Sequence, residues 1–488
     1  MKKGLMIIGK DVDAYLANHI NEQYNAQLNV DIVVLKHRDK LEFEKKFSHI
    51  KNIYSMPEYA YENSASYDAL SDDDIVKKIE LFSDIYNLRN INRYLHYDFF
   101  RAIKKKSTQR QNYIRILSIL DFFSSIEISN YDFSYGELSR SYYLICYDIM
   151  KSSGKVYLSP ANIGPLKGIL YIDDKFQIIN FEAKKQSFMK SDDYQKYIEE
   201  ARQHIAVFRE TPQYNYPFLL TSFSNNLKKL KHVFRKAKNL ILELRANKID
   251  SKFRFDYISR NPFSRVLERE IYSFIKSKLI NLFYFRQAKI ERNDYIFFPL
   301  HVHPETTTSL FSEFSIDHVS QSASTIEYLS KSIPIANKLL VKEHPAMIGY
   351  RDLGSYSKYN QFYNVEFVGP KISQYDALNQ SEYVVTLCGT IGVEALMKGK
   401  KVITLGDAYY NYFRGVKCIS GIEEFPHMFK NSDEFATDDD LLSKDFAFLM
   451  YCTHFGVFNF LIDNDPKVIL QENLDLFTKS MIQELTND

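Results

Sequence analysis

Two loops in the second half of the chain contain residue types that can bind a phosphate group. The first is Lys342-Glu343-His344-Pro345, which follows an apolar run of strand length. A histidine at this place can donate a hydrogen bond to a phosphate and stabilise a leaving nucleotide, and a proline fixes the local turn. We therefore expect Lys342, His344 and Pro345 to line a binding site. In the alternative interpretation, His344 only caps backbone carbonyl groups.

The second loop is the run from Cys388 to Ala395. Gly389 and Gly392 permit close approach of the backbone, Thr390 offers a hydroxyl, and the free N–H groups at the start of the following helix favour an anion. Glu394 lies in the first helical turn, where it can accept hydrogen bonds from ribose hydroxyls. The alternative is a plain strand-to-helix turn, in which the helix dipole favours Glu394.

A third loop follows another apolar run and reads His301-Val302-His303-Pro304-Glu305-Thr306. In extended backbone the two histidines of this motif share one face, which is a spacing that can bind a metal. No cluster of aspartates or further histidines accompanies them. We therefore expect no metal, and predict that His301, His303, Glu305 and Thr306 contact the substrate.

Alternating strands and helices must position these three loops. Strands are predicted over 294–300, 338–342, 365–368, 383–387 and 401–405, and helices over 316–332, 373–378 and 392–398. This rhythm indicates a doubly wound parallel sheet. Ligands of such sheets bind beyond the carboxyl ends of the strands, so the three loops are expected to line one cleft.

The N-terminal half begins with the same kind of unit. Residues 4–9 and 31–35 are predicted strands, and 11–23 is a predicted helix between them. Only Gly9 occupies the first turn, so the glycine-rich signature of dinucleotide-binding proteins is missing. Residues from about 75 to 150 have mostly helical patterns. Two more strands are predicted at 154–158 and 168–172, with 176–181 as the hairpin partner of the latter.

Composition narrows the class of protein. A length of 488 residues suggests two or three domains, and a formal net charge of +2 does not favour nucleic acid as a partner. The four cysteines form no CxxC pair, which argues against disulfides and structural zinc and suits a reducing cytoplasm. The uncharged run near the N-terminus is too short for the apolar core of a signal peptide. The uncharged run 446–462 is interpreted as a buried helix rather than a membrane span.

A basic stretch lies between Leu227 and Phe255. It holds ten lysines and arginines against two acidic residues, a balance of 10 − 2 = +8, and it has one apolar side. Two interpretations stay open: a solvated helix face, or contact with an anionic membrane surface or an anionic glycan acceptor.

The order of the motifs resembles that of the bacterial capsular polysaccharide biosynthesis family, which includes Kdo transferases of GT-B architecture. The resemblance covers roughly residues 295–410. It is carried by the runs Phe298–Thr306, Asp317-His318, Lys342–Pro345, Gly349–Arg351, Gly389–Leu396 and Gly399–Ile403.

The resemblance implies that a nucleotide-sugar donor binds in the C-terminal domain and the acceptor in the N-terminal domain. His344 would contact the donor phosphate, and Glu394 with the loop from Gly389 to Gly392 would hold the nucleotide. The donor would be a CMP-linked ulosonic acid such as Kdo, with no other cofactor. His303 stands where the family pattern has Gln, which leaves the sugar open.

Glycosyl transfer also needs a carboxylate near the anomeric carbon. Glu137 is the first candidate and Asp132 the second, both in the run from Asp132 to Arg140. Glu182 and the pair Asp173-Asp174 are weaker candidates, because turns often carry aspartate for geometric reasons. The alternative for Glu137 is an acid that only favours the start of a helix.

Taken together, the sequence predicts an α/β protein of GT-B type, with two Rossmann-like domains facing each other across a cleft. The predicted divisions are an acceptor-side domain at 1–284, a nucleotide-sugar-binding domain at 285–440, and helices at 441–488 that pack back toward the first domain. The predicted protein is a cytoplasmic glycosyltransferase that builds a surface glycan. A nucleotide-sugar 2-epimerase, a polyol-phosphate transferase or a non-catalytic subunit of capsule assembly are the alternatives.

Overall fold

The structure is a computed structural model of the chain. It describes residues 1–95, 108–164, 166, 168–211, 273–285, 290, 294–302, 321–351, 353–369, 372–419, 421–429, 435, 438–457 and 465–486. The basic stretch 227–255 lies outside the described residues.

The N-terminal part of the chain forms a seven-stranded sheet in the described residues, with the order β13-β6-β5-β4-β1-β2-β3. The strands are β1 (Lys2–Ile8), β2 (Leu28–Val34), β3 (Ile53–Ser55), β4 (Phe133–Tyr135), β5 (Val156–Asn162), β6 (Gly168–Ile172) and β13 (His454–Phe455). The first five are parallel, and β6 pairs antiparallel with both β5 and β13. The order reverses between β1 and β4, as in a Rossmann-like fold.

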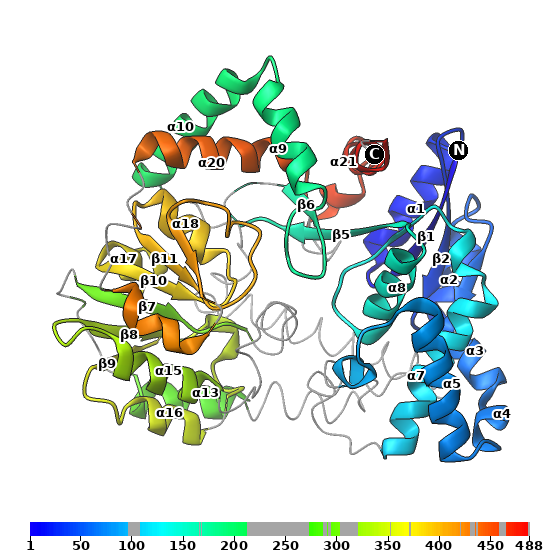
Figure 1. The fold of residues 1–488 in the computed structure, drawn as a ribbon, viewed down its shortest axis with the longest axis horizontal. Coiled ribbons are helices and arrows are strands. Elements are labelled where there is room, and N and C mark those ends of the chain that lie inside the picture. Colours follow the sequence, from blue (N-terminus) through cyan, green and yellow to red (C-terminus); the bar gives the residue numbers. More distant parts are fainter. Residues whose placement is uncertain are drawn as a thin grey trace, which may run out of the picture.

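The second sheet has six strands in the described residues, in the order β12-β11-β10-β7-β8-β9, and its described pairings are all parallel. Its strands are β7 (Tyr295–Pro299), β8 (Lys338–Lys342), β9 (Val365–Val368), β10 (Ser381–Thr386), β11 (Lys401–Thr404) and β12 (Val416–Cys418). This is the doubly wound order with its reversal between β7 and β10. The two sheets confirm the predicted α/β fold with two Rossmann-like units (Figure 1).

Helices accompany both sheets. The N-terminal ones are α1 (Asp11–Gln23), α2 (His37–Lys46), α5 (Asp72–Tyr86), α7 (Gln109–Ser125), α8 (Ser141–Ser152), α9 (Phe181–Lys190) and α10 (Tyr194–Glu210). The C-terminal ones are α13 (Ser273–Phe283), α15 (Gln321–Ser332), α16 (Leu353–Tyr359), α17 (Gln374–Asn379), α18 (Ile391–Met397), α20 (Asp439–Cys452) and α21 (Gln471–Thr486).

The local sequence explains the first unit of the fold. β1 is buried along most of its length, so it is a continuous apolar run rather than an alternating one. α1 has acidic residues in its first turn, which suits the positive end of the helix dipole, and its buried stripe includes Leu16 and Ile20. This stripe packs in the core under the sheet, together with Met6 and Val34.

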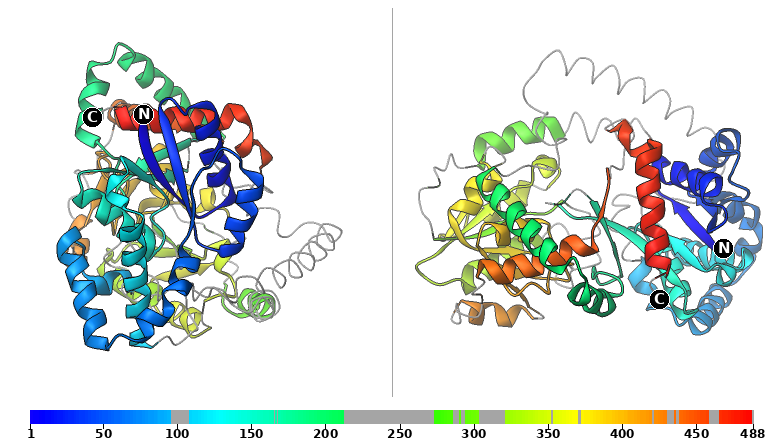
Figure 2. Two further views of the ribbon diagram at one scale, coloured as in Figure 1. Left: turned by 90° about the vertical axis from the view of Figure 1, so that its right-hand side faces the viewer. Right: turned by 90° about the horizontal axis from the view of Figure 1, so that it is seen from above.

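Helices near the C-terminus of the chain, α20 and α21, pack against helices of its N-terminal half. α10 packs along α20, where Arg209 donates to both carboxylate oxygens of Asp439 at 2.9 and 2.6 Å. α21 lies beside α1 instead, as both views of Figure 2 show. Its Glu484 is buried and bonds to Lys184 of α9 at 2.6 Å.

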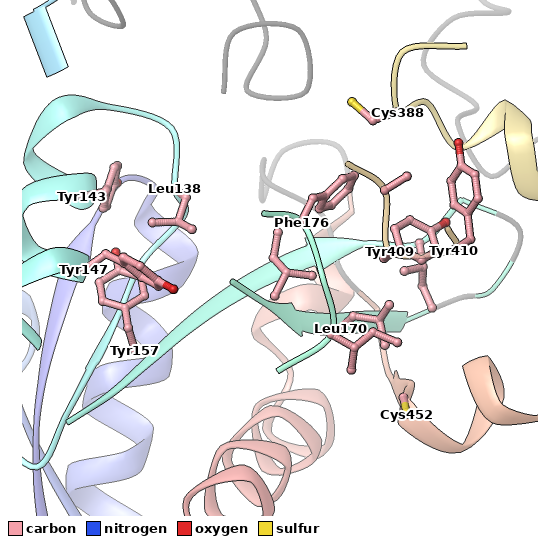
Figure 3. Close-up of a cluster of buried hydrophobic side chains, with 14 of the residues drawn as sticks. Leu138, Tyr143, Tyr147, Tyr157, Leu170, Phe176, Cys388, Tyr409, Tyr410 and Cys452 are labelled. Atoms are coloured by element: carbon pink, nitrogen blue, oxygen red, sulfur yellow. The ribbon is translucent and has the colours of Figure 1, made fainter. Parts of the chain in front are cut away.

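A continuous apolar cluster joins the two sheets. It includes side chains from β5 and β6, from the loop after β4, and from the loop before β12. Figure 3 shows Phe176 between Leu138 and Tyr143 on one side and Tyr409 and Tyr410 on the other. The loops that follow β4 and β10 are therefore held in place by one shared core.

Two local predictions were confirmed only in part. Residues 176–181 return antiparallel beside β6, but they pair with it only through an isolated bridge between Ile172 and Ile178, and Phe181 already begins α9. The longer antiparallel pairing is that of β5 with β6. The buried helix predicted over 446–462 is present as far as Cys452, where α20 ends and β13 follows. Among the described residues, no helix is long and apolar enough to cross a membrane.

Candidate active site

His301 sits at the point where the strand order of the second sheet reverses. It follows β7, and its Nε2 shares a hydrogen bond of 3.0 Å with Oγ1 of Thr386 at the end of β10. The backbone N–H of Gly389 also donates to this oxygen, at 3.2 Å. A Cβ on Gly389 would lie 2.8 Å from His301 Nε2, so only glycine leaves room for the imidazole. The reversal of the sheet thus brings the first and third predicted loops together.

A buried ion pair connects these loops to the end of β8. Glu343 is fully buried, and Arg351 Nε donates to its two oxygens at 3.1 and 2.9 Å. Tyr356 donates to the same carboxylate at 2.8 Å. Arg351 also donates to the backbone carbonyl of His301 at 2.6 Å. Because both charges are paired inside the protein, the pair fixes the position of the His301 and His344 loops.

His344 lies near both His301 and Lys342, beside this ion pair. Burial lowers the pKa of His301 to about 3, with smaller contributions from His344 and Arg351. Burial also lowers the pKa of His344 to about 4, helped by Lys342 and Arg351. Both imidazoles are therefore neutral at pH 7, and each has one N–H to donate.

Lys342 is the strongest indication of an anion site. It is only 6% exposed, and no carboxylate lies within 4.0 Å of its Nζ in the part of the chain that the structure describes. The neighbouring Glu343 points to Arg351 instead. Burial lowers the pKa of Lys342 to about 8, although Glu343 opposes this. An ammonium group that is desolvated in this way gains most from an anion that enters from solvent.

The loop after β10 differs in part from its prediction. Gly392 is required because the ring of Tyr410 packs on it, at 2.6 Å from where a Cβ would be, rather than because a ligand approaches. Glu394 accepts from Gln374 at 2.9 Å, and burial raises its pKa to about 7. α18 has only seven residues, so its dipole contributes little to anion binding.

Thr390 lies against the other half of the chain. A Cβ on Gly164, in the turn between β5 and β6, would be 2.7 Å from Thr390 Cβ. The loop after β10 is thus covered from the N-terminal side. Pro345 is exposed and begins a short 3₁₀ helix. The remaining predicted contacts, His303, Glu305 and Thr306, lie outside the described residues.

The candidate carboxylates lie at different places. Glu137 follows β4 and bonds to Lys10 Nζ at 2.9 Å, at the point where the strand order of the first sheet reverses. Asp132 precedes β4 at the opposite end of that strand, where it accepts from the backbone N–H of Lys3 at 2.7 Å. The structure does not bring it together with Glu137.

The weaker candidates, Asp173, Asp174 and Glu182, lie in an ion pair, in a turn or on an exposed helix face. Asp174 pairs with Arg89 at 2.9 Å, and Asp173 caps its own turn by accepting from two backbone N–H groups. Glu182 is exposed on α9. No group of three or more His, Cys, Asp or Glu suited to a metal is found in the described residues.

Sequence reasoning missed the role of Arg351. The signal was a glutamate and an arginine in one loop after a buried strand, but only the folded chain shows that they pair.

Comparison with known proteins agrees with the motifs. Residues 231–452 match the family model described as capsule polysaccharide biosynthesis protein. The matched stretch is just under half of the chain. It contains all six strands of the second sheet together with α20, and it confirms the resemblance to that family. A comparison with curated protein sequences gave no match.

Three solved structures illustrate what the chain is similar to. The beta Kdo 2,7 transferase KpsC of Thermosulfurimonas dismutans is 16% identical, with 37% of this chain and 55% of that chain covered and a TM-score of 0.23. The beta Kdo 2,4 transferase KpsC of the same organism is 12% identical, with 65% and 79% covered and a TM-score of 0.34. UDP-GlcNAc 2-epimerase of Neisseria meningitidis, bound to UDP-GlcNAc, is 12% identical, with 92% and 98% covered and a TM-score of 0.28. The chain thus spans just over half the length of the first of these.

Proposed function

We propose that the protein is a nucleotide-sugar-dependent glycosyltransferase of capsule polysaccharide synthesis. The observation that carries the proposal is Lys342, a buried lysine with no described carboxylate partner at the end of β8. His344 beside it is neutral, and so is His301 at the adjacent reversal of the sheet. This arrangement suits the phosphate of an activated sugar. The match of 231–452 to a capsule polysaccharide biosynthesis family supports the same class of reaction.

In this proposal Lys342 supplies the positive charge, and His301 and His344 supply neutral N–H donors. As the bond between sugar and phosphate breaks, negative charge develops on the phosphate oxygen, and these preorganised donors stabilise it. The pair of Glu343 and Arg351 holds the donors in place, so little reorganisation is needed during the reaction. No metal is required for this step, and we propose a CMP-linked ulosonic acid such as Kdo as the donor.

The acceptor is proposed to bind at the reversal of the first sheet, near Glu137. Leu138, which follows Glu137, belongs to the same apolar cluster as Cys388 and Tyr410, which lie beside Gly389 (Figure 3). The acceptor would be a growing surface glycan or glycolipid. Contact of 227–255 with an anionic membrane surface stays a prediction.

The test is a turnover assay on the full chain with a panel of nucleotide sugars, with and without a capsule oligosaccharide acceptor. Mass spectrometry should find an acceptor extended by one sugar and one released nucleotide. Epimerised donor without acceptor would support a 2-epimerase instead, and transfer of a polyol phosphate would support a polyol-phosphate transferase. Nucleotide binding without any product would support a non-catalytic subunit.

A further inference from the structure

A second polar cluster lies at the reversal of the N-terminal sheet, between the carboxyl ends of β1 and β4. Gly9 and Lys10 follow β1, and Glu137 follows Gly136 just after β4. Asp13, in the first turn of α1, is at the same edge. This is the edge at which ligands bind in doubly wound sheets. The side chains there are thus placed as in a site, distinct from the group around Lys342.

The two carboxylates of this cluster have different surroundings. Glu137 is committed to an ion pair with Lys10 Nζ, at 2.9 Å. Asp13 instead accepts from the backbone N–H of Lys10 at 3.2 Å, and it keeps part of its surface exposed. A ligand that reaches Asp13 therefore has no described ion pair of this carboxylate to break.

Two tyrosines pack against the glycines of the cluster. The hydroxyl of Tyr143 lies against Gly9, and that of Tyr157 lies 2.9 Å from where a Cβ on Gly136 would be. Tyr157 is 3% exposed, and its hydroxyl has no hydrogen-bond partner in the part of the chain that the structure describes. Buried hydroxyls are nearly always paired. The Tyr157 hydroxyl is therefore a buried polar group without a described partner at this edge of the sheet.

We propose that Asp13 accepts the proton of the attacking acceptor hydroxyl, and that Lys10 and Glu137 are positioning residues that hold it in place. The proposal rests on the proposed glycosyltransferase function. It assigns the base to a residue other than Glu137, the sequence-based candidate. The ligand class is a hydroxyl group of a carbohydrate.

The chemical step balances with the two substrates alone. The acceptor oxygen forms a bond to the anomeric carbon, and its proton moves to an oxygen of Asp13. The bond from the anomeric carbon to the phosphate oxygen breaks, and its electron pair leaves with the nucleotide. If the sugar is first held covalently by the protein, the acceptor hydroxyl loses the same proton in the second displacement.

The surroundings of Asp13 give the reaction a defined pH dependence. Among the described residues, the titratable groups that act on it are Lys10 at the N-cap of its helix, Glu137 after β4, Tyr135 on β4 and Tyr143 on α8. Burial raises the pKa of Asp13 to about 7, Lys10 lowers it, and Glu137 raises it. The base form therefore fills as the pH rises through about 7, and kcat/KM should rise with it.

The test compares three substitutions in the full chain, with kcat measured at saturating donor and acceptor and kcat/KM measured by varying the acceptor at each pH. Asp13→Asn keeps the oxygen that accepts from Lys10 but cannot take a proton, so kcat should fall on the order of 10²-fold or more while donor affinity is unchanged. Asp11→Asn, in the same first turn but exposed, is the matched control and should keep full activity. Glu137→Gln removes a charge that raises the Asp13 pKa, so the rise of kcat/KM should move to lower pH but persist.

Three results would overturn the assignment. Asp13→Asn could retain kcat within a few-fold, it could retain the same rise of kcat/KM near neutral pH, or Glu137→Gln could abolish that rise. Circular dichroism and donor binding check that Asp13→Asn is folded, and Asp13→Glu, which restores a carboxyl, should recover part of kcat. If the wild-type chain transfers no sugar, the proposed function fails and this inference with it. If the wild type transfers sugar and Asp13→Asn does too, the inference alone fails.

Discussion

Replacement of Lys342 by methionine should stabilise the protein while it removes the charge on which donor binding depends. Lys342 lies at the end of β8 and is 6% exposed. Burial lowers its pKa from 10.5 to about 8, which corresponds to about 3 kcal/mol of unfavourable free energy for the charged side chain in the folded state. Methionine has a similar shape and no charge. The free energy of unfolding at pH 7 should therefore rise by up to about 3 kcal/mol in Lys342→Met.

The contribution of Lys342 to the free energy of unfolding should change with pH in a defined direction. Below about pH 8 the lysine is protonated in both states, so the penalty is fully present. Between about pH 8 and 10.5 the folded protein releases the proton while the unfolded chain keeps it. The unfolded state then binds more protons, so wild-type stability gains a contribution that rises with pH. The substitution should remove this contribution.

Urea unfolding of the wild type and Lys342→Met at pH 7, 8, 9 and 10 measures both effects. Lys338→Met is the matched control, because Lys338 is on the same strand but 36% exposed and paired with Glu366 at 2.7 Å. It should lower stability by no more than about 1 kcal/mol. The reasoning is refuted if Lys342→Met is less stable than the wild type at pH 7, or if the difference between them does not shrink from pH 8 to 10.

Three further outcomes follow from the contacts of the site. Arg351→Met leaves the buried Glu343 without its partner and should lower the free energy of unfolding by about 3–5 kcal/mol. A loss below about 1 kcal/mol in urea unfolding would contradict the importance of the ion pair. Gly392→Ala should lower it by about 1–3 kcal/mol, because the Tyr410 ring must move, and an unchanged melting temperature would contradict that packing. Nucleotide affinity measured by calorimetry should fall above about pH 8 as Lys342 loses its proton, whereas Lys342→Met should show no such fall; equal slopes above pH 8 would exclude Lys342 from the site.

Much of the second sheet was predictable from sequence for a physical reason. Strands buried on both faces of a parallel sheet are short apolar runs, and β8 and β11 stand out as such between polar turns. The two-residue strand β13 has no pattern to detect, because its place depends on β6, nearly 300 residues earlier in the chain. The predicted hairpin partner at 176–181 is rich in apolar residues, but with Phe176 and Asn180 in left-handed conformations it pairs with β6 only at Ile178.

The site was predictable as a set of loops but not as a set of contacts. Lys342 and His344 were identified because they lie at and just after the end of a strand. Their burial, which lowers both pKa values, depends on how β7 pairs with β8 and β10, and the sequence does not reveal that pairing. Asp13 carries no distinctive sequence signal, because an acid in the first turn of a helix is common for electrostatic reasons alone. Asp132 had the right residue type, but it lies at the other end of β4 from Glu137.

The central claim is that the group around Lys342 and His344 holds the phosphate of a nucleotide sugar. Calorimetric titration of the full chain with CMP, UDP, GDP and CDP tests it most directly, followed by titration of His344→Ala with the tightest ligand. The account predicts one nucleotide bound per chain and an affinity that is weaker by about 1–3 kcal/mol in His344→Ala, with Glu182→Ala unchanged. It is contradicted if no nucleotide binds the wild type, or if folded His344→Ala binds as tightly.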